Sequence, residues 1–258
     1  MKNKFSSIWS SYFYKKKATF VDSGSTAIYE ALKLLNSKTV LVPTYTCHRI
    51  LNSILKANCT PIILDCDTSL QMDITDIMYY NDCNECNADT IIVPHMFGIQ
   101  SDIKKIKEKT NIQIIEDCSQ CMGLPKLGYY SDIVVASTGP SKYFSIGDNK
   151  DKGGGIIAYN KGNVEWFENI KWIEKSINNF DTIKNKIHSR TEKAQEILNA
   201  GVDLIGKDKP NAWLRAIYFR EEPRKRECYT PLHKIHNKFD CPKVDMYEQY
   251  IDWISIFD

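Results

Sequence analysis

Short apolar runs alternate with amphipathic segments through the first two thirds of the chain. Runs such as PIIL at 61–64 and TIIV at 90–93 have the length and composition of buried strands. Segment 25–35 instead spaces Ile28, Leu32 and Leu35 along one face of a helix. The pattern predicts strands at 39–42, 61–64, 90–93, 112–115, 133–136 and 156–159, and helices at 25–35, 48–57 and 102–109. This alternation predicts an α/β domain with a largely parallel sheet.

The pattern changes near residue 163. Trp166 and Ile173 belong to a stretch with helical spacing, and a charged helical stretch follows to about residue 198. The basic run REEPRKRE then lies between two aromatic segments, WLRAIYF and the terminal YEQYIDWISIF. We therefore expect a large domain over 1–162 and, over 163–258, a helical linker with a reduced C-terminal α+β lobe.

Charge and hydropathy argue against nucleic acid or a membrane as the partner. The 258 residues include 34 basic and 32 acidic side chains, which gives a net charge of only +2. No apolar run approaches the roughly 20 residues that span a bilayer. The N-terminal stretch MKNKFSSIWSSYFYKKK has no continuous apolar core, which argues against a secretory signal. We expect a cytoplasmic protein.

The nine cysteines indicate reduced thiols rather than disulfides in such a protein. Two CxxC pairs, Cys83–Cys86 and Cys118–Cys121, raise the alternative of a four-cysteine zinc site. A predicted strand and a predicted helix separate the two pairs, which favours buried or incidental thiols. His233 and His236 also have the spacing of metal ligands, but we expect no metal site.

In open α/β sheets, ligands bind outside the carboxyl ends of the strands, and three stretches are candidates for this position. In DSGSTAIYEAL at 22–32, a predicted helix begins around Gly24, Ser25 and Thr26. The N–H groups, the hydroxyls and the positive end of the helix dipole suit a phosphate. Ordinary N-capping by serine or threonine explains the same residues.

The stretch IIEDCSQCMG at 114–123 ends a predicted strand at Glu116 and Asp117. A carboxylate in this place can pair with a protonated ring nitrogen, which is the partner that pyridoxal phosphate needs. Gln120, in the following turn, can hydrogen-bond the same cofactor. The alternative is an acidic helix cap.

The stretch STGPSKYF places Lys142 five residues after Ser137, between a strand end and the aromatic pair Tyr143–Phe144. A lysine held in a partly desolvated loop can lose its proton and form a Schiff base. A solvated surface cation is the alternative. The glycines at 153–155 permit close backbone approach just before the next predicted strand.

The chain resembles the DegT/StrS-type nucleotide-sugar aminotransferases in five ordered segments: SGSTAIYEAL, VLVPTYTCHRILNSILKANCTPIILDCD, IIVPHMFGIQSDI, IIEDCSQCMG and LGYYSDIVVASTGPSKYFSIG…GGGIIAYN. These segments cover roughly residues 15–160, and a weaker similarity follows at 229–242. The resemblance implies fold type I of the pyridoxal-phosphate enzymes, a three-layer sandwich around a largely parallel sheet. It also implies pyridoxal 5'-phosphate as the cofactor.

The same resemblance implies a role for most of the residues singled out above. Lys142 matches the Schiff-base lysine, which also moves protons as general base and acid. Asp117 matches the partner of the pyridine nitrogen, and Gln120 the residue near the phenolic oxygen. The phosphate contacts match Gly24, Ser25, Thr26 and Ser137.

Other positions depart from the family pattern or stay ambiguous. Cys47 stands where the family commonly stacks an aromatic residue on the cofactor ring, and Tyr45 or His48 are the possible substitutes. His95 follows a strand, where it either faces the substrate or is structural. Asn178 and Asn179 are loose candidates for the asparagine with which a second subunit reaches the phosphate.

The resemblance implies amino transfer from L-glutamate to a nucleotide-linked keto sugar by a homodimer. Such a reaction serves the synthesis of a surface glycan such as lipopolysaccharide or capsule. Some relatives that dehydrate sugars carry histidine at the lysine position, so Lys142 favours transamination. The alternatives are another pyridoxal-phosphate reaction, or a degenerate member that binds the cofactor or a partner without turnover. Cys47 and the short chain motivate the degenerate alternative.

Overall fold

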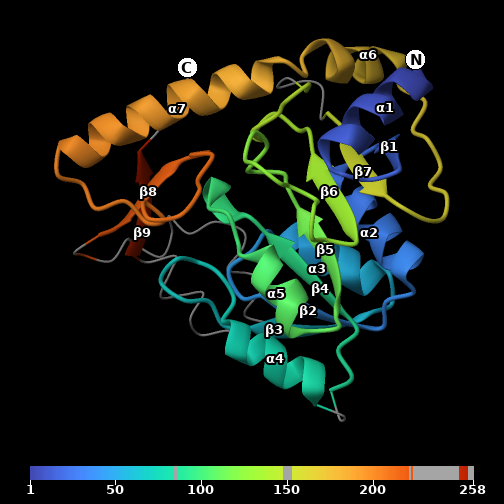
Figure 1. Cartoon of the computed structure of the whole chain (residues 1–258), viewed down its shortest axis with the longest axis horizontal. Coiled ribbons are helices and arrows are strands. Elements are labelled where there is room, and N and C mark those ends of the chain that lie inside the picture. The colour runs from blue at the N-terminus through green and yellow to red at the C-terminus, as the bar shows by residue number, and fades with distance from the viewer. Residues whose placement is uncertain (84–85, 148–152, 221, 223–249, 255–258) are drawn as a thin grey trace.

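Seven strands form one sheet in the structure of the chain, a computed structural model that describes residues 1–83, 86–147, 153–220, 222 and 250–254. The strands are β1 (Lys17–Val21), β2 (Thr39–Pro43), β3 (Thr60–Leu64), β4 (Thr90–Pro94), β5 (Gln113–Asp117), β6 (Ile133–Ser137) and β7 (Gly155–Tyr159). Their order is β1-β7-β6-β5-β4-β2-β3 (Figure 1). Only β7 runs antiparallel to its neighbours, so the predicted largely parallel sheet is confirmed.

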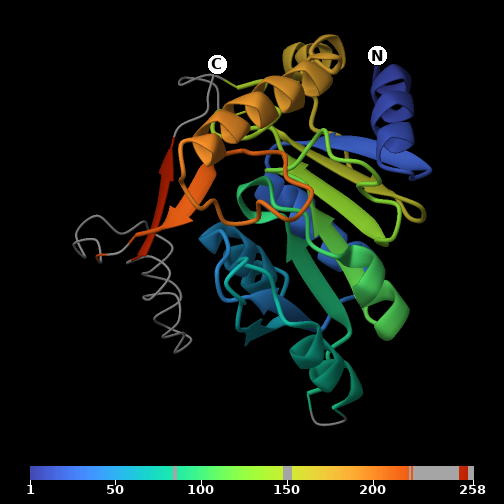
Figure 2. The ribbon, with the colours of Figure 1, turned by 60° about the vertical axis from the view of Figure 1, so that its left-hand side comes forward.

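Helices cover both faces of this sheet. The helices are α1 (Lys2–Tyr12), α2 (Gly24–Leu35), α3 (His48–Lys56), α4 (Ile74–Asp82), α5 (Ile103–Lys109), α6 (Ile170–Asn178) and α7 (Thr182–Asn199). Residues of α2 and α3 share one apolar cluster with the sheet, whereas α1, α6 and α7 pack on the other face. Because both faces are covered, the strands are almost continuously apolar. The predicted three-layer sandwich is confirmed (Figure 2).

The elements predicted from periodicity are confirmed to within two residues at their ends. The pattern did not predict α1, β1 or α4. It was also wrong at 163–169, which is irregular; α6 begins only at Ile170, after the Asn169 side chain caps the Trp172 N–H. Trp166 still packs into the core, edge-on to the Phe5 ring at 5.4 Å. Its apolar spacing therefore reports burial rather than a helix.

The N-terminal helix α1 closes the sheet through an aromatic cluster. Phe5 and Trp9 on α1 and Phe13, which caps its C-terminus, are fully buried. The Trp9 indole N–H donates to Ser176 Oγ of α6 at 2.9 Å, and its ring meets that of Phe180 at 5.1 Å. Residues more than 160 positions apart therefore share one core.

The C-terminal part forms a second, two-stranded sheet. Helix α7 runs from α6 toward β8 (Ala216–Phe219) and β9 (Ile251–Ile254), which pair antiparallel (Figure 1). The segment before β8 is hydrogen-bonded to the large sheet's loops, with Leu214 N donating to Phe97 O at 2.9 Å. Segment 229–242 and both of its histidines lie outside the described residues. The domain division at residue 162 stays a prediction.

Glycines let the start of β7 approach α2, as the sequence predicts. A Cβ on Gly155 would lie 2.3 Å from the Ser23 carbonyl oxygen, and one on Gly154 would lie 2.2 Å from the Phe20 ring. Ser23 is the residue that caps α2. The absence of a side chain on Gly155, the first residue of β7, thus lets α2 begin against this strand.

We expect Gly155→Ala to lower the free energy of unfolding by about 3 kcal/mol, because the Ser23 backbone cannot yield as a flexible side chain does. Urea denaturation measures this loss. Gly201→Ala is the control: Gly201 has a φ of 89° but open space around it, so only backbone strain of about 1 kcal/mol is expected. A loss below about 1 kcal/mol for Gly155→Ala contradicts the close approach.

Candidate active site

A cavity of about 660 Å³ lies beside the carboxyl ends of β5 and β6 and the first turns of α2 and α3. Its lining includes eight of the residues predicted from the sequence: Gly24, Ser25, Cys47, His95, Asp117, Gln120, Ser137 and Lys142. A second cavity, of about 680 Å³, is lined by α4 and α5 and contains neither Asp117 nor Lys142. The chemistry therefore gathers in the first cavity.

The first turn of α2 forms one wall of this cavity. The Ser23 side chain accepts the Thr26 N–H at 3.1 Å and so caps the helix. The helix itself offers no acceptor to the N–H groups of Gly24 and Ser25. A Cβ on Gly24 would lie 2.7 Å from Ser137 Cβ, so the helix start touches the end of β6. N–H groups, hydroxyls and the helix dipole together suit an anion such as phosphate.

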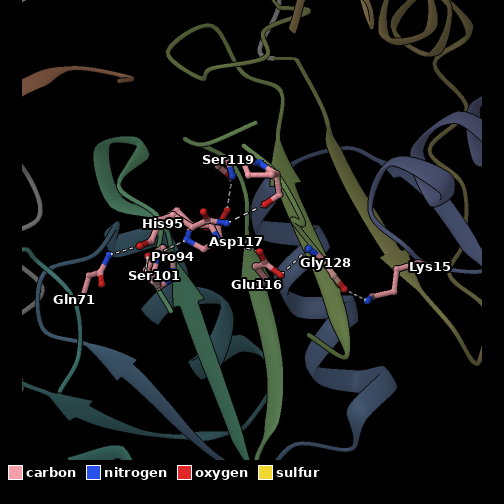
Figure 3. A network of polar contacts seen from close by, with 11 residues as sticks. Lys15, Gln71, Pro94, His95, Ser101, Glu116, Asp117, Ser119 and Gly128 are labelled. Carbon is pink, nitrogen blue, oxygen red and sulfur yellow. Dashed lines mark hydrogen bonds and ion pairs between the residues drawn. The ribbon is translucent and has the colours of Figure 1, made fainter. Parts of the chain in front are cut away.

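Asp117 is held in a fixed orientation at the end of β5. Its Oδ1 accepts hydrogen bonds from Ser119 N at 2.9 Å and from Ser119 Oγ at 2.5 Å (Figure 3). Ser119 Oγ in turn accepts from Ser137 N at 2.8 Å, which ties the turn to β6. This arrangement presents a carboxylate at the cavity wall.

Backbone hydrogen bonds and two buried aromatic residues fix the loop after β6 that contains Lys142. Lys142 N donates to Gly139 O at 3.0 Å, and Ile146 N donates to Thr138 O at 3.1 Å. The next two residues, Tyr143 and Phe144, are fully buried. Lys142 is itself half-buried at the cavity, the setting in which a lysine amine is less well solvated.

Gln120 and Cys47 reach the cavity in different ways. Gln120 Oε1 accepts the Phe97 N–H at 2.8 Å, which holds its amide in place. Cys47 is the N-cap residue of α3 and is half-buried. The stacking position of the family pattern thus carries a thiol.

Three of the predicted residues do not line the cavity. The Thr26 hydroxyl lies 3.0 Å from Ser23 Oγ within the helix cap. Tyr45 is buried beside Phe97 in another apolar cluster. His48 lies next to the cavity wall; burial, Arg49 and Lys142 lower its pKa.

The His95 side chain is buried behind the cavity and pairs with Glu116. His95 Nε2 lies 3.0 Å from Glu116 Oε1, and His95 Nδ1 accepts the Ser101 N–H at 3.0 Å (Figure 3). The ring is therefore neutral, with its proton on Nε2. Glu116 Oε2 also accepts the Gly128 N–H at 2.9 Å. Burial opposes ionisation of Glu116, but these hydrogen bonds outweigh it and lower the pKa of its carboxyl.

The same histidine lies in a group of potential metal ligands. Ligand atoms of His95, Cys118 and Cys121 lie within 4.8 Å of one another, all buried. A metal needs an imidazole nitrogen with a free lone pair, but Nδ1 accepts from Ser101 and Nε2 donates to Glu116. Burial also raises the pKa of both thiols, which disfavours the thiolates that zinc binds. The group is suited to packing rather than to metal.

Among the lining residues that the sequence did not predict, two bear on the proposed chemistry, Ser119 and Arg49. Ser119 orients Asp117, and the Asp-x-Ser spacing of a local side-chain turn is the signal that could have identified it. Arg49 lines the cavity from the first turn of α3. The signal that could have identified Arg49 is a basic residue in the first turn of a predicted helix, where acidic residues are favoured.

We expect Glu116→Gln to lower the free energy of unfolding by about 2–3 kcal/mol at neutral pH, because an amide cannot accept from both His95 and Gly128. The lowered pKa means that this stabilisation is complete above the ordinary carboxyl pKa of about 4 and is lost as the pH falls through the folded value. Urea denaturation at several pH values measures it.

The matched control is Glu108→Gln, the same change at an exposed carboxylate of α5. We expect a change of less than about 0.5 kcal/mol. A loss for Glu116→Gln that does not shrink toward acidic pH contradicts the ionised carboxylate.

None of the described helices is both long enough and apolar enough to cross a membrane. In sequence, a model of the DegT/DnrJ/EryC1/StrS aminotransferase family matches residues 2–173. GDP-perosamine synthase of Escherichia coli O157:H7 is 30% identical over 169 residues, 61% of this chain and 44% of that protein. The 3-oxo-glucose-6-phosphate:glutamate aminotransferase of Bacillus subtilis is 27% identical over 190 residues, which cover 71% of this chain and 41% of that protein. The chain thus spans less than half the length of these curated relatives.

Solved structures share the fold. A putative sugar aminotransferase from Streptococcus pneumoniae in its PLP form matches all of this chain and 86% of its own, with a TM-score of 0.78 at 15% identity. NtdA from Bacillus subtilis with bound cofactor PMP matches 84% of this chain and 57% of its own, with a TM-score of 0.68 at 22% identity. The family model spans the whole seven-stranded sheet with the Asp117 and Lys142 segments, and the chain therefore belongs to the DegT/DnrJ/EryC1/StrS aminotransferase family.

Proposed function

We propose that this protein is a pyridoxal-phosphate aminotransferase that moves an amino group from L-glutamate to a nucleotide-linked keto sugar. One observation carries the proposal: Lys142 and Asp117 line a single cavity together with the first turn of α2. Family membership supports the reaction class. The names of relatives, which include sugar-nucleotide and sugar-phosphate aminotransferases, support the class of acceptor.

The residues at the cavity fit the cofactor. Gly24, Ser25 and Ser137 offer N–H groups and hydroxyls to a phosphate, and Asp117 offers a carboxylate to a protonated ring nitrogen. When bound, pyridoxal phosphate supplies the electron sink for amino transfer. The hydrogen bonds from Ser119 fix the orientation of the Asp117 carboxylate, which would hold that nitrogen protonated.

Lys142 provides the covalent attachment and the proton transfer. The half-buried amine takes the proton from the α carbon of the amino donor as a general base. It would pass that proton to C4′ of the cofactor, and after the keto sugar binds it would move a proton from C4′ to the sugar carbon as a general acid. The buried side chains of Tyr143 and Phe144 hold the loop so that this amine stays at the cavity.

The setting of the reaction follows from the same family. We infer a cytoplasmic homodimer that makes an amino sugar for a surface glycan such as lipopolysaccharide or capsule. Asn178 ends α6 and Asn179 caps it. Both are retained as candidates for a contribution to a second subunit's phosphate site.

A cofactor-binding protein without turnover is the second candidate. Cys47 favours it, because a thiol provides less stacking surface for the cofactor ring than an aromatic side chain does. In that case the cofactor binds at Lys142 but glutamate does not react. Another reaction of the same cofactor is distinguished by turnover with a different substrate.

We expect the protein mixed with pyridoxal phosphate to show the visible absorbance of a lysine-bound cofactor, and Lys142→Ala to lack it. Borohydride reduction followed by peptide mass spectrometry should place the label on Lys142. Lys161→Ala, which removes an exposed lysine, is the control and should keep both signals. Label on another lysine, or no absorbance at saturating cofactor, contradicts the proposal.

We expect Asp117→Asn to bind the cofactor but to react with glutamate about 100-fold more slowly or worse, because a neutral amide does not hold the ring nitrogen protonated. Stopped-flow absorbance after addition of glutamate measures the rate. Ser119→Ala should slow the reaction with glutamate less, because it removes only a side-chain hydrogen bond that orients the Asp117 carboxylate. An unchanged rate in Asp117→Asn removes Asp117 from the mechanism, and no reaction of the unaltered protein favours the second candidate.

A further inference from the structure

Arg49 lines the candidate active site from the first turn of α3. The helix begins at His48 with Cys47 as its cap, so Arg49 is its second residue. The side chain is exposed at the wall of the cavity that also contains Lys142 and Asp117. An exposed guanidinium at the mouth of a binding cavity is available to a ligand.

This position is unfavourable for a cation in the unliganded protein. The first turn of a helix carries a partial positive charge, which favours acidic side chains and disfavours basic ones. In the described part of the chain, Arg49 makes no ion pair within 4 Å that would offset this repulsion. Residues that are unfavourable for their local structure, like this cation at a helix N-terminus, concentrate at functional sites.

The surroundings of Arg49 add to its positive charge. Lys142 lines the same cavity as Arg49, and burial together with these two nearby cations lowers the pKa of His48, so two cations lie near a histidine that is neutral at pH 7. The cavity's two aspartates are Asp22, which is exposed, and Asp117, whose Oδ1 is bonded to Ser119. This end of the cavity therefore attracts anions.

We propose that Arg49 binds an anionic group of a substrate, a carboxylate or a phosphate, in the proposed aminotransferase reaction. The first turn of α2 serves the phosphate of the cofactor in that reaction, so the guanidinium of Arg49 serves a second anion. Its planar fork matches both carboxylate and phosphate oxygens with two parallel hydrogen bonds. The anion comes from one of two sources, the amino donor or the nucleotide of the acceptor.

The test measures binding to the cofactor-loaded protein by calorimetry, with glutarate as the dicarboxylate probe and with GDP and UDP as the diphosphate probes. We expect Arg49→Ala to weaken one probe class about 10-fold or more, as loss of a charge-assisted pair predicts. Arg49→Lys should recover part of that loss, because it keeps the charge without the fork. Loss for glutarate assigns the donor carboxylate, and loss for the nucleotides assigns the acceptor phosphates.

Lys56→Ala is the matched control, because Lys56 is a cation in the last turn of the same helix. It should leave the affinity for every probe unchanged. Thermal unfolding without probes gives a second readout: Arg49→Ala should raise the melting temperature and Lys56→Ala should lower it, because the helix dipole favours a cation only at its C-terminal end.

Unchanged affinity in Arg49→Ala, or no binding of any probe to the unaltered protein, overturns the proposal. The outcome is independent of catalysis. If probe binding depends on Arg49 but glutamate does not react, the proposed function fails while the anion site stands. If glutamate reacts normally in Arg49→Ala and all affinities are unchanged, the anion site at Arg49 fails while the proposed function stands.

Discussion

The buried carboxylate of Glu116 constrains the carboxyl ends of β4 and β5, beside which the candidate active site lies. An ionised carboxyl at this depth is tolerated only when its oxygens accept hydrogen bonds, and they accept from His95 and Gly128. These bonds hold the residue after β4 and the turn before β6 against β5. Successive side chains of a strand point to opposite faces, so fixing Glu116 also sets the direction of Asp117. A carboxylate outside the proposed chemistry thus positions Asp117, the carboxylate that we propose takes part in it.

Close backbone contacts position the other residues that we propose bind the cofactor. The start of α2 meets the end of β6 and the start of β7 at distances that leave no room for a Cβ on Gly24 or Gly155. The residue after Lys142 in its loop is Tyr143, and the Arg190 guanidinium carbon lies over the Tyr143 ring, 4.6 Å from its centroid. Arg190 belongs to α7, beyond the part that matches the family model. The C-terminal part of the chain therefore supports the lysine loop directly.

The cavity wall formed by the start of α3 differs in character from the wall formed by the start of α2. Cys47 and Arg49, two positions apart at the start of α3, place a small thiol and a cation on one wall. The thiol opens space that an aromatic side chain would fill. The cation brings positive charge to a helix end that already carries it, at some cost in stability. Both features are explained together if this wall receives a charged substrate.

The sequence by itself determined the alternation of strands and helices, because this follows from local periodicity. Its resemblance to a known family implied the three-layer fold and the proposed cofactor residues Asp117 and Lys142. Only the tertiary structure decided that His95 pairs with Glu116 rather than facing the cavity, that Tyr45 lies in a separate core, and that Arg49 reaches the site. It also revealed α1, whose aromatic face is stabilised by α6 from the far end of the chain. The physical reason is common to all four. Periodicity reports which side chains are buried, whereas the partner that each one meets depends on segments distant in sequence.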